Sequence, residues 1–109
     1  MSKNLIDKAC VPCRGGILPL TFKEASTFLS DIPGWELKEE ATRLYQSFKF
    51  ENFQTALNFV NKVGIIAEKE GHHPDIELGW GYVNILIFTH AINGLHENDF
   101  ILVAKINAI

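Results

Sequence analysis

The chain has 109 residues, of which 47% are hydrophobic, and this is enough for one domain with a single core. Ten basic and thirteen acidic side chains give a net charge of −3 without any basic cluster, which argues against direct binding of nucleic acid. No apolar signal segment follows Met1, and the apolar run at 85–88 is far too short to span a bilayer. We therefore expect a soluble cytoplasmic protein that does not cross a membrane.

Residues 1–19 hold two prolines, two adjacent glycines and no sustained periodicity, which predicts an extended N-terminal lead-in before a single domain over 20–109. The lead-in carries a C-x-x-C pair, Cys10 and Cys13. One such pair supplies only half of a tetrahedral zinc site, and no second pair or H-x-x-x-H is present to complete it. We favour an incidental, reduced pair. A metal or redox role, including one shared between subunits, is the alternative.

A capping box at Thr21–Glu24 marks the start of the first predicted helix, because the threonine hydroxyl can accept a backbone N–H while the glutamate reaches back. This helix should run to about residue 30, where Asp31–Gly34 ends it and turns the chain. Alternating apolar and polar residues then predict strands at 35–37 and 44–50, joined as a hairpin. The second of these strands has one apolar face and one wetter face.

The longest predicted helix has Asn52 as a plausible N-cap. Apolar residues over 53–67 recur with the i, i+3, i+4, i+7 spacing of an amphipathic helix. Gly71 suits the position just beyond the helix C-terminus, and Pro74 follows. Some apolar residues, including Ile65, lie partly off this stripe, which fits either a subunit contact or a broad buried face.

A second predicted hairpin pairs strands at 75–78 and 82–90 around the turn 79–81, and Asn93–Gly94 turns the chain again. The tail from about residue 98 could be helix or strand by its apolar pattern, and its helix-forming residues favour helix. The predicted order is therefore α-β-β-α-β-β-α. This order indicates the α+β class, as a four-stranded antiparallel sheet with three helices packed on one face.

Two adjacent imidazoles, His72 and His73, lie where the longest helix ends and an extended segment begins. Pro74 biases His73 toward extended geometry and leaves His72 in the irregular junction, so both rings could line one cleft. A third histidine, His90, follows near the end of the last predicted strand. Because the unperturbed pKa of histidine lies near neutrality, three converging imidazoles are suited to acid–base chemistry.

Each of these residues also has a simpler interpretation. A single histidine of the pair is more often an exposed loop residue, and His90 at the end of an apolar strand is more often a satisfied core or rim residue. Glu68 and Asp99 can be surface charges, and Asp99 can also be a carboxylate favoured near a helix N-terminus. Trp80 is either turn packing or an aromatic wall for a flat ligand. Taken together, the three histidines with Asp75 and Asp99 favour a site.

A metal site is the main chemical alternative, because three histidines can hold zinc and leave one position open. Adjacent histidines rarely both bind one ion, however, and the sequence contains no i, i+4 pair of histidines. It also contains no phosphate-binding loop, dinucleotide fingerprint or serine nucleophile motif. Nucleotide binding and serine hydrolysis therefore have no support, and a metal site stays open as the alternative to acid–base chemistry.

With these residues in view, the chain resembles the pterin-4a-carbinolamine dehydratase family over nearly the whole domain, from Pro19 to the C-terminal segment. The most specific part is E-K-x-x-H-H-P-D at Glu68–Asp75. An aromatic residue at Trp80, then Thr89-His90, and then G-L-x-E-x-D at Gly94–Asp99 follow with the family's spacing.

Two positions depart from the family pattern. Ile76 stands where a large aromatic residue is common, and Trp80 stands where a tyrosine is common. Both would reshape the pterin pocket, but neither removes an ionisable group.

The resemblance implies an enzyme that dehydrates 4a-hydroxytetrahydropterin to quinonoid dihydropterin and so recycles the cofactor of aromatic amino acid hydroxylases, without a metal or prosthetic group. It also implies a homodimer or homotetramer and a link to such a hydroxylase. A non-catalytic dimerising regulator with the same fold is the alternative. The expected catalytic residues are His72, His73 and His90, and the expected substrate-binding residues are Glu68, Pro74, Asp75, Trp80 and Asp99.

Within this scheme, we expect His72 and His90 to approach the departing hydroxyl. His73 would orient the pterin or receive the proton from N5. The carboxylates would bind the donor groups of the ring or tune the imidazoles.

Overall fold

A four-stranded antiparallel sheet and three α-helices make up the computed structural model, which describes residues 4–11 and 16–109. The order α-β-β-α-β-β-α and the α+β class are therefore as predicted. The helices are α1 (Phe22–Leu29), α2 (Phe53–Glu70) and α3 (Glu97–Asn107), the strands are β1 (Glu36–Lys38), β2 (Arg43–Lys49), β3 (Asp75–Gly79) and β4 (Tyr82–Ile87), and the 3₁₀ turns are η1 (Leu5–Asp7) and η2 (His90–Ile92).

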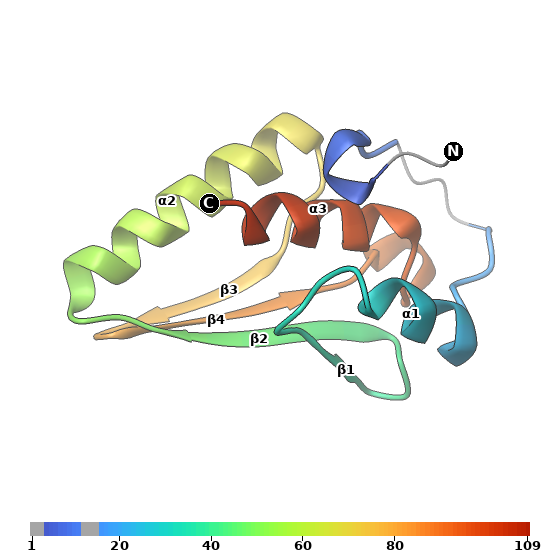
Figure 1. Cartoon of the computed structure of the whole chain (residues 1–109), viewed down its shortest axis with the longest axis horizontal. Helices are drawn as coiled ribbons and strands as arrows, with labels where there is room; N and C mark the ends of the chain where they lie inside the picture. Colours follow the sequence, from blue (N-terminus) through green and yellow to red (C-terminus); the bar gives the residue numbers. More distant parts are fainter. Residues whose placement is uncertain (1–3, 12–15) are drawn as a thin grey trace.

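The sheet has the strand order β1-β2-β4-β3, and the helices lie on one of its faces (Figure 1). Alternate residues of the central strands point into the core on this side, and Leu44, Val83, Ile85 and Ile87 are each fully buried there. On β2, Ser47 and Lys49 are exposed on the opposite face. The core therefore lies between the sheet and the helical layer.

Local signals set the helix ends as predicted. The Thr21 hydroxyl accepts the Glu24 N–H at 3.2 Å, and the Glu24 carboxylate accepts the Thr21 N–H at 2.9 Å, which completes the capping box of α1. Asn52 caps α2 by accepting the Thr55 N–H at 2.9 Å. Gly71 ends α2 with φ of 65°, a left-handed conformation that glycine adopts without a Cβ clash.

The last strand is shorter than predicted. β4 ends at Ile87, whereas the alternating pattern extended the strand to His90. The chain instead closes a small loop in which Thr89 and Gly94 form an isolated bridge around η2. Asn93 adopts φ of 49° at the end of this turn, a left-handed conformation that asparagine tolerates better than most residues.

Trp35, predicted as the first residue of a strand, precedes β1. Its indole N–H donates to the side chain of Asn107 on α3 at 2.9 Å, and the ring is 5% exposed. Trp35 is therefore buried by its contact with α3, whereas the alternating pattern alone had placed it in the strand.

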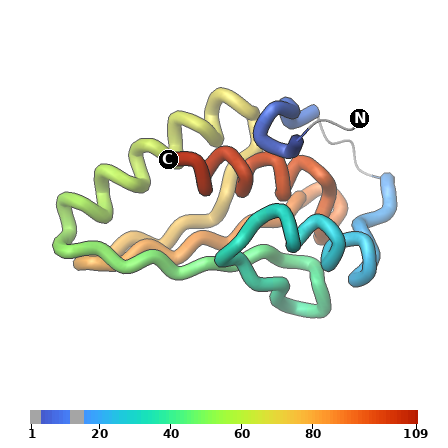
Figure 2. The backbone as a smooth tube through the Cα atoms, in the orientation of Figure 1, coloured from blue at the N-terminus to red at the C-terminus, as the bar shows by residue number. Residues whose placement is uncertain are grey.

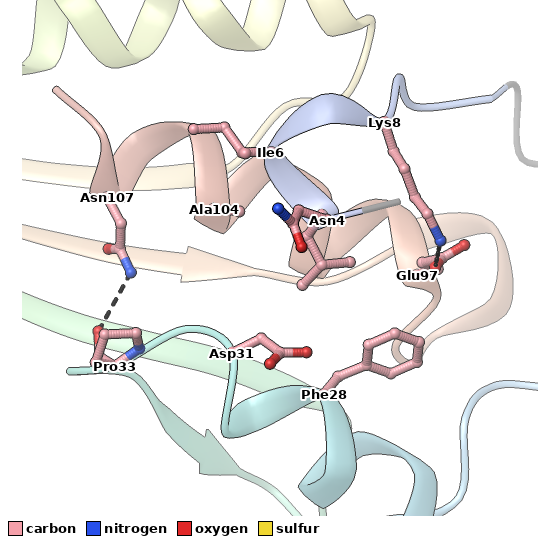
Figure 3. A pocket seen from close by; sticks show the side chains of 10 residues that line it. Asn4, Ile6, Lys8, Phe28, Asp31, Pro33, Glu97, Ala104 and Asn107 are labelled. Atoms are coloured by element: carbon pink, nitrogen blue, oxygen red, sulfur yellow. Dashed lines mark hydrogen bonds and ion pairs between the residues drawn. The ribbon is translucent and has the colours of Figure 1, made fainter. Parts of the chain in front are cut away.

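The N-terminal segment packs against α3, where η1 lies beside the helix (Figures 1 and 2). The Lys8 ammonium forms an ion pair with Glu97 at 2.7 Å. A cavity of about 740 Å³ lies between η1, α1 and α3, and Asn107 donates to the Pro33 carbonyl at 3.3 Å along its edge (Figure 3). No histidine lines this cavity, so it is separate from the predicted histidine site.

Cys10 is a free, half-buried cysteine in the same segment, and Cys13 lies outside the described residues. Within residues 4–11 and 16–109, no helix is both long enough and apolar enough to cross a membrane.

Candidate active site

All the predicted site residues except Trp80 gather where α2 ends, β3 begins and α3 begins, next to η2. A pocket of about 310 Å³ opens here. Five residues predicted from the sequence line this pocket, namely His72, His73, Pro74, Asp75 and His90. The structure therefore brings all three expected catalytic histidines to one cavity, although they come from two separate parts of the chain.

His72 is the most firmly held of the three histidines. Its Nε2 lies 2.5 Å from Oδ1 of Asp99, and the two side chains are 13% and 0% exposed. Gly71 positions the ring, because its left-handed conformation turns the chain at the end of α2 toward the pocket. With Nε2 engaged by a carboxylate, the imidazole presents Nδ1 for a ligand.

Asp99 has a place in the fold as well as in the site. It is the third residue of α3, and its Oδ2 accepts the backbone N–H of His96 at 2.9 Å, which completes a capping box. The same oxygen accepts the Thr89 hydroxyl at 2.8 Å. Because Asp99 is fully buried, these bonds and the contact with His72 replace the water that a carboxylate needs.

The other two histidines are paired with carboxylates near the solvent. His73 Nε2 lies 2.9 Å from Glu68, with side-chain exposures of 62% and 82%, and His90 Nε2 lies 3.7 Å from Asp75, with exposures of 61% and 57%. Such exposed pairs contribute little to stability, about 0–1 kcal/mol each. They leave both rings free to reorient around a ligand.

An aromatic stack supports His90 on the open side of the sheet. The ring centroids of Phe88 and His90 are 4.1 Å apart. The Arg43 guanidinium lies 3.5 Å from the centroid of the Phe88 ring, and it also donates to the Asn93 side chain at 2.8 Å. Through these contacts, Arg43 of β2 is connected to Phe88 after β4 and to Asn93 after η2, next to His90.

Three predicted residues do not line the pocket, namely Glu68, Trp80 and Asp99, and of these Asp99 contacts His72 from outside the lining. Glu68 contacts His73 from the last turn of α2 but is itself outside the cavity. Trp80 is 72% exposed in the turn after β3, at the opposite end of that strand from Asp75. Five strand residues at about 3.3 Å each separate them by roughly 16 Å.

Five lining residues were not among the predicted site residues: Val11, Gly71, Thr89, Ala91 and Asn98. Thr89 had a partial signal, since alternation on the last strand puts it on the same face as buried Val83, Ile85 and Ile87. Asn98 and Val11 had none, because their contact joins segments 87 residues apart.

Charge interactions next to the pocket concern Cys10 and Glu70. The backbone N–H of Cys10 donates to Glu70 at 2.9 Å, and this bond, with the Lys105 ammonium 3.3 Å away, lowers the pKa of Glu70 against the opposing effect of burial. Burial, with the nearby Glu70 charge, raises the pKa of the Cys10 thiol to about 12. The thiol therefore stays protonated at neutral pH and is a poor nucleophile.

Among the residues that the structure describes, no three His, Cys, Asp or Glu side chains are grouped so that they could hold a metal ion. The imidazoles that line the pocket, one of which is oriented by a buried carboxylate, can perform proton transfer.

Comparison with known proteins points to one family. The family model described as pterin 4 alpha carbinolamine dehydratase matches residues 18–109. A candidate pterin-4-alpha-carbinolamine dehydratase from Methylococcus capsulatus is 56% identical over 106 residues, which cover 97% of this chain and 93% of the relative. A candidate of the same name from Halorhodospira halophila is 53% identical over 106 residues, which cover 97% of each chain.

Solved structures show the same fold. A crystal structure described as a transcriptional coactivator/pterin dehydratase from Brucella melitensis superposes with a TM-score of 0.77 at 33% identity, and the match covers 83% of this chain and 96% of that one. A pterin dehydratase-like protein described as a RuBisCO assembly factor superposes with a TM-score of 0.59 at 24% identity, covering 69% and 87%, which is evidence for the fold alone.

Proposed function

Since this chain belongs to the pterin-4a-carbinolamine dehydratase family, we propose that it dehydrates 4a-hydroxytetrahydropterin to quinonoid dihydropterin by histidine acid–base catalysis. The observation that supports this most directly is the buried contact between His72 and Asp99 at the edge of a pocket that His73 and His90 also line. A carboxylate in this position fixes the orientation of the imidazole, as acid–base catalysis requires.

The reaction requires two proton transfers and no redox change. The bond between C4a and the hydroxyl oxygen breaks, the N5–H bond breaks, and a C4a–N5 double bond forms as water departs. Hydroxide is a poor leaving group, so an acid must protonate it while a base takes the proton from N5. A well-placed acid or base with a pKa near the working pH contributes about 10²–10⁴-fold to the rate.

His72 is the histidine best held for the proton transfer to the departing hydroxyl. The bond from Nε2–H to Asp99 leaves Nδ1 as the nitrogen that carries or accepts the transferred proton. His90 also lines the pocket and would approach the same hydroxyl, whereas the exposed His73 would orient the pterin or receive the proton from N5.

The remaining predicted residues would bind the substrate or hold the histidines. Glu68 lies within hydrogen-bond distance of His73, and Asp75 lies 3.7 Å from His90. Both carboxylates would accept N–H groups of the pterin ring. Pro74 shapes the chain between the histidines and β3. Trp80 would have to act from outside the pocket of a single chain, and we propose such a contact only in a homodimer or homotetramer.

The test of this function is dehydration of enzymatically generated 4a-hydroxytetrahydropterin, followed by absorbance in the presence of a chelator. The wild type should accelerate the reaction over the spontaneous rate, and His72→Ala should lower kcat by at least about 100-fold. His73→Ala and His90→Ala should each lose activity as well. A folded variant with full activity would remove that histidine from the scheme.

A matched control is available in the fourth histidine. His96 is the N-cap of α3, and its ring accepts the Asn98 N–H at 3.0 Å outside the pocket lining. Asparagine is a preferred N-cap residue, so His96→Asn should retain the helix and wild-type kcat. No acceleration by well-folded wild type, or activity lost with chelator, would contradict metal-free catalysis.

A second candidate is a dimerising regulator with the same fold. The description of the Brucella melitensis relative as a transcriptional coactivator as well as a pterin dehydratase favours it. Sedimentation velocity would measure whether this chain forms the expected homodimer or homotetramer. Co-purification of a specific partner together with absence of dehydratase activity would favour the regulator, whereas activity that supports an aromatic amino acid hydroxylase in a coupled assay would favour pterin recycling.

A further inference from the structure

A short N-terminal segment, residues 8–11, reaches the histidine pocket. Its last residue, Val11, lines the pocket together with His72, His73 and His90. Val11 is the bulkiest apolar side chain among the lining residues, and it is 57% exposed. A flat heterocycle bound in this pocket would therefore contact the polar histidines and also the apolar side chain of Val11 from the N-terminal segment.

The backbone of Val11 is held on both sides by one buried side chain. The Asn98 amide oxygen accepts the Val11 N–H at 3.0 Å, and the Asn98 amide nitrogen donates to the Val11 carbonyl at 2.7 Å. Asn98 is only 2% exposed. Both polar atoms of this buried amide form hydrogen bonds with the backbone of Val11. These two bonds fix the position of Val11 more strongly than side-chain packing at an exposed site could.

The rest of the segment is anchored to the elements that carry the site. Cys10 donates to Glu70, two residues before His72, and Glu70 is 7% exposed in its ion pair with Lys105. At the other end, Lys8 pairs with Glu97 at the start of α3. The segment therefore joins the end of α2, which positions His72, to the start of α3.

We propose that residues 8–11 form a fixed wall of the substrate pocket, in which Val11 packs against the bound pterin and Asn98 is the positioning residue that holds Val11 there. This inference rests on the proposed function and adds to it two residues outside the histidine cluster. The wall contributes to binding of the substrate and leaves proton transfer to the histidines.

The test compares steady-state kinetics of full-length variants with 4a-hydroxytetrahydropterin. Val11→Gly removes the apolar contact and should raise KM about five- to tenfold with kcat within about twofold of wild type. Asn98→Ala should raise KM similarly. Because Asn98 acts through Val11, the double variant should raise KM no further than Val11→Gly alone. Leu18→Gly, at a residue of the same lead-in that is 90% exposed and outside the pocket, should leave both constants unchanged.

Binding of 7,8-dihydrobiopterin, measured by calorimetry, separates this inference from the proposed activity. Unchanged KM and Kd in Val11→Gly, or additive effects of the two substitutions, would overturn the proposed wall even in a fully active enzyme. A wild type that binds this pterin without dehydrating its substrate would overturn the function, and the Kd values of the variants would then decide the role of the wall. A wild type that neither binds nor reacts would overturn both.

Discussion

Asp99 combines a structural and a chemical task in one carboxylate. Its Oδ2 completes the N-terminal cap of α3 and binds Thr89, while its Oδ1 binds His72. A carboxylate favoured near a helix N-terminus was one of the simpler interpretations of this residue, and the structure combines that role with the contact to a histidine. The two interpretations are therefore compatible at this position.

Replacement of Asp99 should separate these tasks. Asp99→Asn preserves the size of the side chain but replaces the carboxylate that orients His72 by an amide, so we expect kcat to fall by at least about 100-fold. Thr89→Val is the control, because it removes one hydrogen bond to Asp99 and leaves the contact between Asp99 and His72 in place. It should lower kcat by less than about tenfold. Equal kcat in wild type and Asp99→Asn, with folding verified by circular dichroism, would exclude this role.

The thiol of Cys10 provides a second prediction for a single residue. Its pKa is raised to about 12 by burial, so in the native state little thiolate is present at pH 8. Iodoacetamide at pH 8 should therefore modify Cys10 at least about tenfold more slowly in the native protein than in urea, as measured by mass spectrometry of the Cys10 peptide. Equal rates in the two conditions would show that the thiol is freely accessible.

At the scale of elements, the end of α2 determines where the histidine pair lies. Gly71 has φ of 65°, and no atom lies within 4 Å of where its Cβ would be. Gly64, inside the same helix, also has open space around it but has no positive φ. The two glycines therefore differ in backbone conformation rather than in crowding.

This difference predicts opposite effects of the same substitution. Gly71→Ala should lower the free energy of unfolding by about 1 kcal/mol, because alanine is strained in the left-handed conformation. Gly64→Ala should raise it by about 0.5–1 kcal/mol through higher helix propensity. Urea denaturation would measure both. Destabilisation by Gly64→Ala would indicate that this face of α2 is covered, for example by another subunit.

The element boundaries show how far local sequence information extends. Caps at Thr21 and Asn52 and the glycine at 71 were predicted correctly, because each depends on hydrogen bonds within a few residues. The extension of the last strand to His90 was wrong, because the alternating pattern continues past Ile87 while the chain forms the turn of η2. Alternation alone cannot distinguish a strand residue from an extended residue that enters a turn.

For the whole molecule, the contact between Glu70 and the N-terminal segment predicts a dependence of stability on pH. The hydrogen bond from the Cys10 N–H lowers the pKa of Glu70 below its usual 4.5. The Glu70 carboxyl therefore binds its proton less tightly in the folded state than in the unfolded state. The stabilisation is therefore fully present above the unfolded pKa and is lost as the pH falls through the folded pKa.

Urea unfolding between pH 3 and 7 would test this dependence. Wild-type stability should fall below about pH 4.5 more steeply than that of Glu70→Gln, which cannot titrate at this position. Glu51→Gln, at an exposed glutamate just before α2, is the matched control and should keep the wild-type profile. Parallel pH profiles for wild type and Glu70→Gln would contradict the proposed anchoring.

The sequence by itself determined the order of the elements, the fold class, the family and the histidines of the pocket, because capping, periodicity and a contiguous motif are local properties. Only the tertiary structure decided that Asp99 is the partner of His72, 27 residues away, and that Val11 meets Asn98 across 87 residues. It also separated Trp80 from the pocket by the length of β3. These features depend on which distant segments pack together, and that is set by burial of the whole core rather than by any short stretch of chain.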